Sequence, residues 1–529
     1  MIGQTQSHIR MTSSSPSRKG HRVWLPVSTV VLAVIGLLCI QLKPELERNF
    51  RGWLTSMAVI LALLLTGLWF LLLSRFPGRV RLATALVLVV GWFGFKKLTR
   101  MESAVDGRGL PHFVWKWTPR HEAKIHDQTS AAHAAVTVPQ GASDVPQFYG
   151  PKRDGIVHDA NLARDWKVAP PKLLWRQPIG IGWSAFSVVG GRAYTQEQRG
   201  EDELVTCYEL ISGRLLWSHA NHVRFVEWQG GDGPRATPTV DGGSVFAIGG
   251  TGVLDCLDAM TGRLIWSHDV LKENNLPNIT WGKSCSPLVY DDRVVVTGGD
   301  AAGPTVLAFN KTTGGPLWKA GAHRAGYASP VLVTLAGRRV IVSLNAGTLT
   351  IHDAATGDVL LDYLWKDVKW PIAAQPAVLD GDRIFLTAGY GMGCLMLQIK
   401  AGADGRMEAV ELWRNNKLKA QFNSVAVRDG FLYGLDDGSL ACMDVATGER
   451  KWKDGRFGSG QSLMVDDMLL VQSEQGPVVL VEARPDGYHE LGRIDALKSK
   501  TWNHPTLAGR YLLVRNDQEA MCFELPTSK

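Results

Sequence analysis

The residues of this chain that could bind a ligand stand just before, or at the start of, repeated copies of one short strand motif. They are Trp183, Ser184, Arg235, Trp281, Lys283, Tyr327, Gln421, Asn423, Trp502, Asn503 and His504. Aromatic rings stack on flat molecules, and the cations Arg235 and Lys283 can pair with carboxylates. If the first residues of these strands lie close together in the fold, we predict a site that binds a flat or anionic ligand. The alternative is that these side chains only fill or solvate a narrow channel. The principal candidates are Trp183, Arg235, Trp281, Lys283, Tyr327, Asn423, Trp502 and His504.

Other patterns that carry chemistry are missing from the sequence or wrongly spaced. There is no GxxxxGK[ST] and no GxSxG, and the glycines of Gly389–Gly393 precede a strand rather than a helix. His121, Glu122 and His126 resemble a zinc motif, but the histidines are one residue too far apart to share a helix face. The cysteines include no CxxC and no adjacent pair. We therefore predict neither a metal site nor a disulfide framework.

The elements that must position the candidate residues are short strands joined by a repeated turn. The run Leu254–Trp266, LDCLDAMTGRLIW, is a strand, a tight Asp–Gly turn and a return strand. The turn glycine recurs at Gly213, Gly262, Gly314 and Gly357, at spacings of 49, 52 and 43 residues, and again at Gly448. A period of this length built from hairpins is typical of a β-propeller.

A second motif, a small or polar residue followed by an apolar strand, precedes each hairpin. Its eight copies begin at Phe186, Thr237, Ser286, Ser329, Gln375, Ser424, Gln461 and His504. We therefore predict an all-β fold with eight blades, in which the first strand of each blade lines a central channel. Ala520–Leu525 matches the first strand of the hairpin and Leu173–Trp175 the missing second strand. The two ends should complete one blade, which leaves no free sheet edge.

Three apolar runs precede the propeller. They cover about 23–42, 53–74 and 80–98, and a membrane helix needs about 20 residues. The third run is marginal, so two or three transmembrane helices are predicted, and three are favoured. The positive residues of the loops weakly favour an N-terminus inside the cell. Three spans would then place the propeller outside the cytoplasmic membrane.

The predicted organisation is a polar tail (1–22), transmembrane helices (23–98), a tether (99–144) and the propeller (145–529). Phe113, Trp115 and Trp117 in the tether alternate with polar residues and are expected at the membrane interface. The net charge of +7 is concentrated around the apolar runs, where membrane topology explains it, so no nucleic-acid partner is expected.

The repeat Ala/Cys-x-Asp/Asn-x-x-Thr-Gly-x-x-x-Trp resembles the tryptophan-docking repeat of pyrroloquinoline quinone (PQQ) type propellers, over about residues 145–525. The resemblance implies an eight-bladed ring in which each tryptophan packs between neighbouring blades. The tryptophans concerned are Trp175, Trp217, Trp266, Trp318, Trp413 and Trp452. The segment Phe148–Gly155 also resembles the entry to many PQQ-like repeat proteins of environmental bacteria.

The resemblance implies a family with at least two kinds of member. Quinoprotein dehydrogenases bind PQQ and calcium and oxidise alcohols or sugars, whereas BamB-like members carry the repeat without the cofactor and act as scaffolds. The nearest candidates for calcium ligands or a catalytic base are Glu197, Asn423 and Asn503. Asp300 and Asp382 are acidic loop residues that nothing in the sequence favours for either role. This sequence has no adjacent cysteines of the kind that commonly form a vicinal disulfide against PQQ in alcohol dehydrogenases.

These observations favour a non-catalytic binding or scaffold protein of the bacterial cell envelope. It is expected in the inner membrane as a multi-pass protein, with the propeller in the periplasm, another envelope protein as partner and no cofactor. The alternative is a membrane-bound PQQ-dependent dehydrogenase that oxidises a sugar or an alcohol.

Overall fold

The computed structural model describes residues 24–43, 46–101, 111, 113–119, 125, 136–365 and 372–528. The chain forms two compact units. The first consists of residues 1–46 and 50–99, and the second of residues 47–49 and 100–529. The potential zinc motif at His121, Glu122 and His126 lies outside the described residues.

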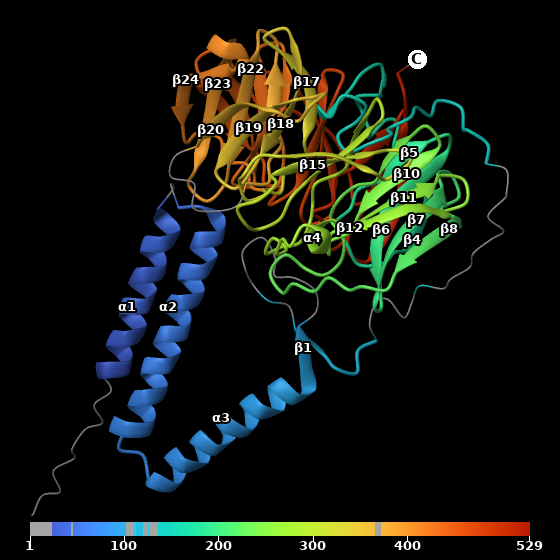
Figure 1. The fold of residues 1–529 in the computed structure, drawn as a ribbon. Coiled ribbons are helices and arrows are strands. Elements are labelled where there is room, and N and C mark those ends of the chain that lie inside the picture. Colours follow the sequence, from blue (N-terminus) through green and yellow to red (C-terminus); the bar gives the residue numbers. More distant parts are fainter. Residues whose placement is uncertain are drawn as a thin grey trace, which may run out of the picture. The chain divides into compact units, whose positions relative to one another are not determined.

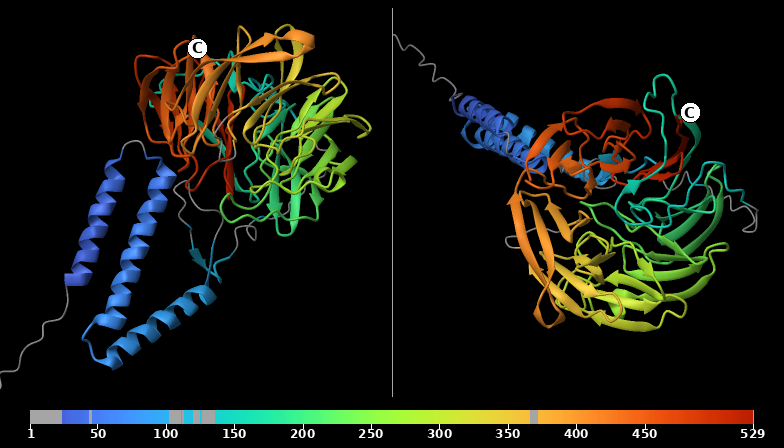
Figure 2. Two further views of the ribbon diagram at one scale, coloured as in Figure 1. Left: turned by 60° about the vertical axis from the view of Figure 1, so that its left-hand side comes forward. Right: turned by 90° about the horizontal axis from the view of Figure 1, so that it is seen from above.

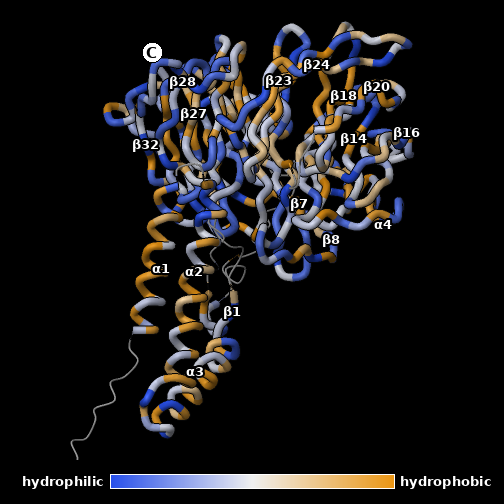
Figure 3. The backbone as a smooth tube through the Cα atoms, turned by 90° about the vertical axis from the view of Figure 1, so that its left-hand side faces the viewer, coloured by the Kyte–Doolittle hydropathy of each residue, from blue (hydrophilic) through white to orange (hydrophobic). Residues whose placement is uncertain are grey.

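The first unit consists of long apolar helices. They are α1 (Trp24–Leu42), α2 (Arg48–Leu68), which continues as the π-helix η1 (Trp69–Leu73), and α3 (Gly78–Leu98). In each of these three, the most apolar stretch has no buried residue, and length and composition would allow the helix to cross a membrane. Much of the tube that follows these helices is orange in Figure 3, the colour of hydrophobic residues. The second apolar run is predicted to begin at about residue 53, but the helix begins at Arg48. The prediction misses the first turn because that turn is polar and a search for apolar runs does not include it.

A short sheet follows α3. Its strands β1 (Thr99–Met101) and β2 (Phe113–Trp115) pair with each other. The rings of Trp115 and Trp117 stack with their centroids 4.9 Å apart.

Eight sheets in the described part of the second unit form the blades of a propeller around a central axis, and the four strands of each blade pair antiparallel (Figures 1 and 2). Blades one to four are β5–β8 (Ser187–Val189, Arg192–Arg199, Asp202–Glu209, Leu215–Asn221), β9–β12 (Thr239–Asp241, Ser244–Ile248, Val253–Asp258, Leu264–Asp269), β13–β16 (Leu288–Tyr290, Arg293–Thr297, Val306–Asn310, Pro316–Ala320) and β17–β20 (Val331–Leu335, Arg338–Leu344, Thr348–Asp353, Val359–Leu364). The eight-bladed fold predicted from the repeat is confirmed.

The remaining four blades follow the same order from the channel outward. They are β21–β24 (Ala377–Leu379, Arg383–Ala388, Gly393–Ala401, Met407–Asn415), β25–β28 (Ala426–Arg428, Phe431–Asp436, Ser439–Asp444, Arg450–Asp454), β29–β32 (Gln461–Val465, Met468–Gln472, Val478–Glu482, Glu490–Ile494) and β33–β35 (Thr506–Ala508, Tyr511–Arg515, Glu519–Glu524) with β4 (Lys172–Pro178). Short helices α4 (Val270–Glu273) and η3 (Ala403–Gly405) lie in connections.

Blade eight closes the ring. Its outer strand β4 comes from the beginning of the propeller and pairs antiparallel with the last strand, β35, so that Cys522 faces Trp175. The predicted closure by the two ends is therefore confirmed. No blade in the described ring is left without its outer strand.

The repeated turn of one blade contacts the tryptophan of the preceding blade. Cys207 faces Trp217 across β7 and β8, and a bulge follows the pair. The indole Nε1 of Trp217 donates to the carbonyl of Ala259 in the next blade at 3.1 Å. The same ring lies against Gly262, where an added Cβ would come 2.5 Å from Trp217 Cε3. The other indoles that donate to a main-chain carbonyl are those of Trp175, Trp266, Trp413 and Trp452.

Trp318 lies against Gly357 in the same way, but its indole Nε1 has no hydrogen-bond partner among the described residues. Two blades have no tryptophan at this position. In blade four, Leu361 occupies the tryptophan position, and in blade seven Gly492 does so. An added Cβ at Gly492 would lie 2.6 Å from the Cβ of Trp166. Trp166, which is 4% exposed and comes from the segment before β4, therefore packs where the blade has no tryptophan of its own.

The segment from Val145 to Val157 runs through the centre of the ring. Val145 pairs with Val188 on the innermost strand of blade one, and β3 (Ile156–Val157) pairs in parallel with β29 of blade seven. Between them, the buried Arg153 donates from Nη1 to the carbonyls of Ser286 and Pro330 at 3.1 and 3.0 Å. We call residues 145–157 the plug, because it ties the inner strands of several blades together.

Candidate functional site

The predicted ligand-binding residues lie in connections that lead from the outer strand of one blade to the inner strand of the next. The structure brings several of their rings together. The centroids of Trp183 and Trp502 are 5.2 Å apart, and those of Trp281 and Tyr327 are 5.6 Å apart. The Tyr327 hydroxyl accepts a hydrogen bond from the main-chain N–H of Trp281 at 3.1 Å. We call the region formed by these connections, with Trp183, Trp281, Tyr327 and Trp502, the mouth.

The guanidinium of Arg235 is turned toward protein oxygens. It donates to the carbonyls of Gly231 and Gly233, both at 2.6 Å, and its Cζ lies 4.8 Å from the centroid of the Phe225 ring. Burial lowers the pKa of Arg235 to about 10, against the opposing effect of Glu227. Arg235 therefore holds its own loop in shape.

The ammonium of Lys283 is enclosed. The residue is 0% exposed, and Nζ donates to the carbonyl and the hydroxyl of Thr297, both at 2.8 Å, and to the carbonyl of Gly298 at 2.5 Å. Burial lowers the pKa of Lys283. The three donors of the ammonium are thus used by the blade that carries it.

Two further candidates are committed to internal contacts. Asn423 donates from Nδ2 to the carbonyl of Leu435 at 3.1 Å. The His504 ring lies 4.2 Å from the ring of Tyr149 in the plug, and its nitrogens face the carbonyls of Pro505 and Ser462. His504 and Tyr149 line a cavity of about 270 Å³ between the plug and the inner strands. These two residues therefore belong to the plug side of the channel.

Carboxylates, which the predicted set does not contain, lie beside its members. Glu474 accepts from the indole Nε1 of Trp502 at 3.1 Å, and Glu203 and Glu227 both act electrostatically on Arg235. Glu203 is 3% exposed and accepts from the N–H of Gly250 at 2.9 Å. These residues lie in strand ends and loops outside the repeated strand motif. Only the pairing of neighbouring hairpins brings them to the mouth.

The residues considered for calcium or for a catalytic base lie apart. The Glu197 carboxylate accepts from the hydroxyl of Tyr208 at 2.7 Å and pairs with Arg199 at 3.2 Å. Asp300 pairs with Arg324 at 2.5 Å. Within the residues that the structure describes, no group of three or more His, Cys, Asp or Glu side chains is arranged to hold a metal ion.

The described mouth does not fit PQQ with calcium. A tricarboxylic ligand needs several free cations, but Lys283 gives all three of its N–H donors to protein oxygens, and Arg235 is already fixed by two bonds to carbonyls of its own loop. Calcium needs several converging oxygen ligands, and the carboxylates just described each have separate partners. The arrangement instead favours contacts made by aromatic side chains.

One loop of the mouth presents apolar side chains to solvent. In the connection 222–235, Val226 is 65% exposed and Trp228 is 58% exposed. The loop is held by an ion pair between Arg224 and Asp232 at 2.9 Å and by the Arg235 bonds to its carbonyls. A large aromatic side chain on a fixed loop is the kind of residue that anchors protein–protein contacts.

The burial of His504 predicts a loss of stability in acid. Burial lowers its pKa to about 4, below the 6.5 of an exposed histidine, so the unfolded chain binds the proton first as pH falls. Stability that is present at pH 7 should decline by on the order of 2–3 kcal/mol as pH falls from 6.5 to 4. Urea unfolding of the wild type and of His504→Gln at pH 7 and 4.5 measures this loss. The variant should lose less than the wild type, and His222→Gln, at an 86% exposed side chain, should behave as the wild type does.

Comparison with known sequences identifies the repeat. The family model PQQ_2, described as outer membrane protein assembly factor BamB, matches residues 201–454, from β7 to β28. A protein of Bordetella pertussis with the same description, outer membrane protein assembly factor BamB, is 23% identical over 347 residues, which are 64% of this chain and 72% of that protein.

Solved structures share the fold. BamB from Moraxella catarrhalis matches with a TM-score of 0.51 and 14% identity, over 67% of this chain and 100% of that chain. Quinohemoprotein alcohol dehydrogenase from Comamonas testosteroni matches with a TM-score of 0.53 and 11% identity, over 73% and 81% of the two chains. At these identities the likeness is one of fold alone, and it extends to both kinds of family member.

Proposed function

Because its propeller is built from PQQ-like repeats, we propose that this chain is a membrane-anchored binding or scaffold protein of the bacterial cell envelope. The propeller would stand on the periplasmic side of the inner membrane. Its partner would be another envelope protein, and no cofactor would be needed. The matched protein of Bordetella pertussis is described as an assembly factor, which supports a role in protein–protein contact.

The observation that carries this proposal concerns Arg235 and Lys283, the two cations of the predicted ligand-binding set. A quinoprotein would keep cations free for the carboxylates of PQQ, but Arg235 donates to main-chain carbonyls of its own loop and Lys283 to main-chain carbonyls at the end of β14. Freeing Lys283 would leave the acceptors of Thr297 and Gly298 unpaired in a buried position, which costs about 1–3 kcal/mol for each group. The exposed Trp228 and Val226 offer a protein partner apolar contact area beside the same mouth.

The alternative, a PQQ-dependent dehydrogenase of sugars or alcohols, rests on the shared fold of the quinohemoprotein. Calorimetric titration of PQQ with excess calcium into the full chain in detergent, followed by dye reduction with sugars and alcohols, separates the two functions. We expect neither heat of binding nor dye reduction. Binding at about micromolar strength (about −8 kcal/mol) with dye reduction, both lost in Arg235→Ala, would contradict the scaffold function.

A further inference from the structure

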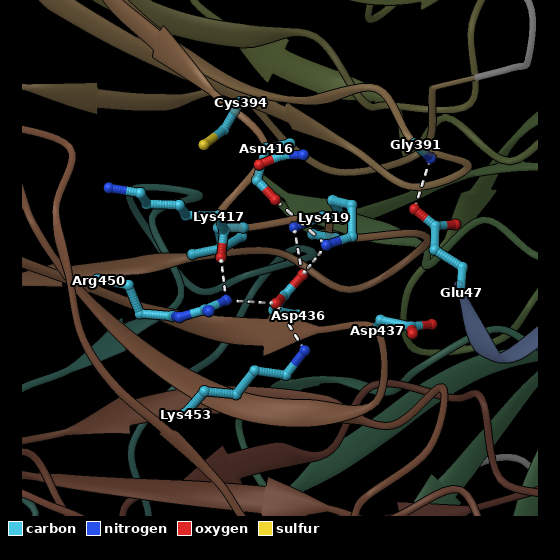
Figure 4. A network of polar contacts seen from close by, with 12 residues as sticks. Glu47, Gly391, Cys394, Asn416, Lys417, Lys419, Asp436, Asp437, Arg450 and Lys453 are labelled. Carbon is cyan, nitrogen blue, oxygen red and sulfur yellow. Dashed lines mark hydrogen bonds and ion pairs between the residues drawn. The ribbon is translucent and has the colours of Figure 1, made fainter. Parts of the chain in front are cut away.

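A cluster of cations between blades five and six is built around one buried carboxylate (Figure 4). Asp436, the last residue of β26, is 0% exposed. Its Oδ1 accepts from the main-chain N–H of Lys419 at 3.0 Å and pairs with the ammonium of the same residue at 3.1 Å. Its Oδ2 pairs with Arg450 at 3.2 Å and with Lys453 at 2.7 Å. Three cations from two segments of the chain therefore converge on a single negative charge.

The other carboxylates of this network make no ion pair with these three cations, as far as the described residues show. Asp437 accepts from the main-chain N–H of Arg48, and Glu47 accepts from the main-chain N–H of Gly391. Glu449 pairs with a fourth cation, Lys417, at 2.5 Å. Asp437 still acts electrostatically on Lys419 and Lys453, and Glu47 on Lys419, but from farther away than Asp436. Only Asp436 therefore offsets the repulsion among the three cations by direct ion pairs.

The cations keep donors for a further anion. Arg450 uses Nη1 for the carbonyl of Lys417 and for Asp436, which leaves Nε and Nη2 without a hydrogen bond to any described residue. Lys453 has three N–H donors and gives one of them to Asp436. The side chains of Lys419, Arg450 and Lys453 are 15%, 38% and 30% exposed, so a ligand can reach them from solvent.

We propose that Lys419, Arg450 and Lys453 form a binding site for a phosphate group, with Asp436 holding the three side chains in place. Phosphate suits the site because it carries up to two negative charges and several strong acceptor oxygens, and arginine binds such oxygens in pairs. Lys419 comes from the connection that also carries Asn423, but none of the three cations is one of the predicted mouth residues, and the site does not depend on the function proposed above. The group could belong to free phosphate or to the headgroup of an anionic lipid.

Single substitutions test the site without removing all partners of Asp436. In Arg450→Gln or Lys453→Gln, the carboxylate keeps two of its three cations, so the fold should persist. Calorimetric titration of inorganic phosphate into the full chain, with ionic strength held by chloride, should show affinity weakened about fivefold or more in each variant, as expected for a partly exposed charged hydrogen bond. The matched control is Lys451→Gln on the same strand, whose ammonium pairs instead with Asp444 at 3.4 Å, and it should bind as the wild type does.

Asp436→Asn separates a phosphate site from a cluster that only neutralises a buried carboxylate. Under the proposal, the variant is less stable to heat than the wild type because its three cations lack their carboxylate. It binds phosphate more tightly than the wild type does, and added phosphate restores its thermal stability. No phosphate binding by the wild type, or equal weakening in Lys451→Gln and Lys453→Gln, would overturn the site. Repeating the titration in phosphatidylcholine nanodiscs with and without phosphatidic acid identifies the source. Weaker binding of inorganic phosphate in the presence of phosphatidic acid assigns the site to a lipid headgroup, and unchanged binding assigns it to free phosphate.

Discussion

Gly262→Ala is expected to lower the free energy of unfolding by about 3 kcal/mol or more, since it combines backbone strain with overpacking. Gly262 has φ = +72°, a conformation that side chains disfavour, and its added Cβ would come 2.5 Å from Trp217 Cε3. The tryptophan ring is 3% exposed, and its indole N–H is bonded to the next blade, so it has little room to move. Urea unfolding of the full chain in detergent, followed by tryptophan fluorescence, measures the loss.

The control comes from the same blade. Gly242 also has a positive φ, +54°, but an added Cβ there would meet nothing within 4 Å. Gly242→Ala should therefore cost only about 1 kcal/mol, the backbone share of the effect. If both variants lost the same stability, the contact between Trp217 and Gly262 would not hold the two blades together.

Arg153→Met is expected to destabilise the propeller by about 3 kcal/mol through buried acceptors left without donors. Arg153 is 5% exposed, and burial lowers its pKa to about 9. Its guanidinium donates to Ser286 and Pro330 in blades three and four, and its Nε donates to Gln147 of the plug at 2.7 Å. Methionine retains the apolar length of the side chain but none of these bonds.

Lys152→Met provides the comparison, because this neighbour is exposed and should change stability by no more than about 0.5 kcal/mol. Hydrogen exchange reports the consequence locally. The amide of Met464, which donates to the carbonyl of Gly155 at 2.9 Å, should exchange faster in Arg153→Met and at the wild-type rate in Lys152→Met. Unchanged protection in both variants would mean that the plug is held without its arginine.

The eight blades could be predicted because each blade repeats a local rule. The Asp–Gly turn, the cysteine before it and the tryptophan after it fall within about a dozen residues, and the pairing of Cys207 with Trp217 follows from that spacing alone. Blade seven, with Gly492 in the tryptophan position, was found only through its strand motif at Gln461. Trp166 could not be assigned, since its contact with Gly492 joins distant parts of the chain without any periodic signal.

The candidate site was less predictable for the same reason. The strand motif located Trp183, Trp281, Tyr327 and Trp502 at one mouth, and their rings do meet in pairs. What the cations contact could not be read from spacing, because Lys283 turns inward to carbonyls of its own blade. A lysine in a sequence signals charge, and only the packed strands decide whether that charge faces a ligand or the protein.

The closure of blade eight by β4 and β35 has a consequence for biosynthesis. β4 leaves the ribosome before the other strands of its own blade and before β5 to β32, whereas its partner β35 is the last of the blade strands in the sequence. During translation, β4 therefore has no strand beside it, and the ring is an open arc with two exposed sheet edges. Such edges invite pairing with other chains. The nascent propeller should need protection until β35 has been made and has left the ribosome, and a ribosome stalled before β35 should leave a product prone to aggregation.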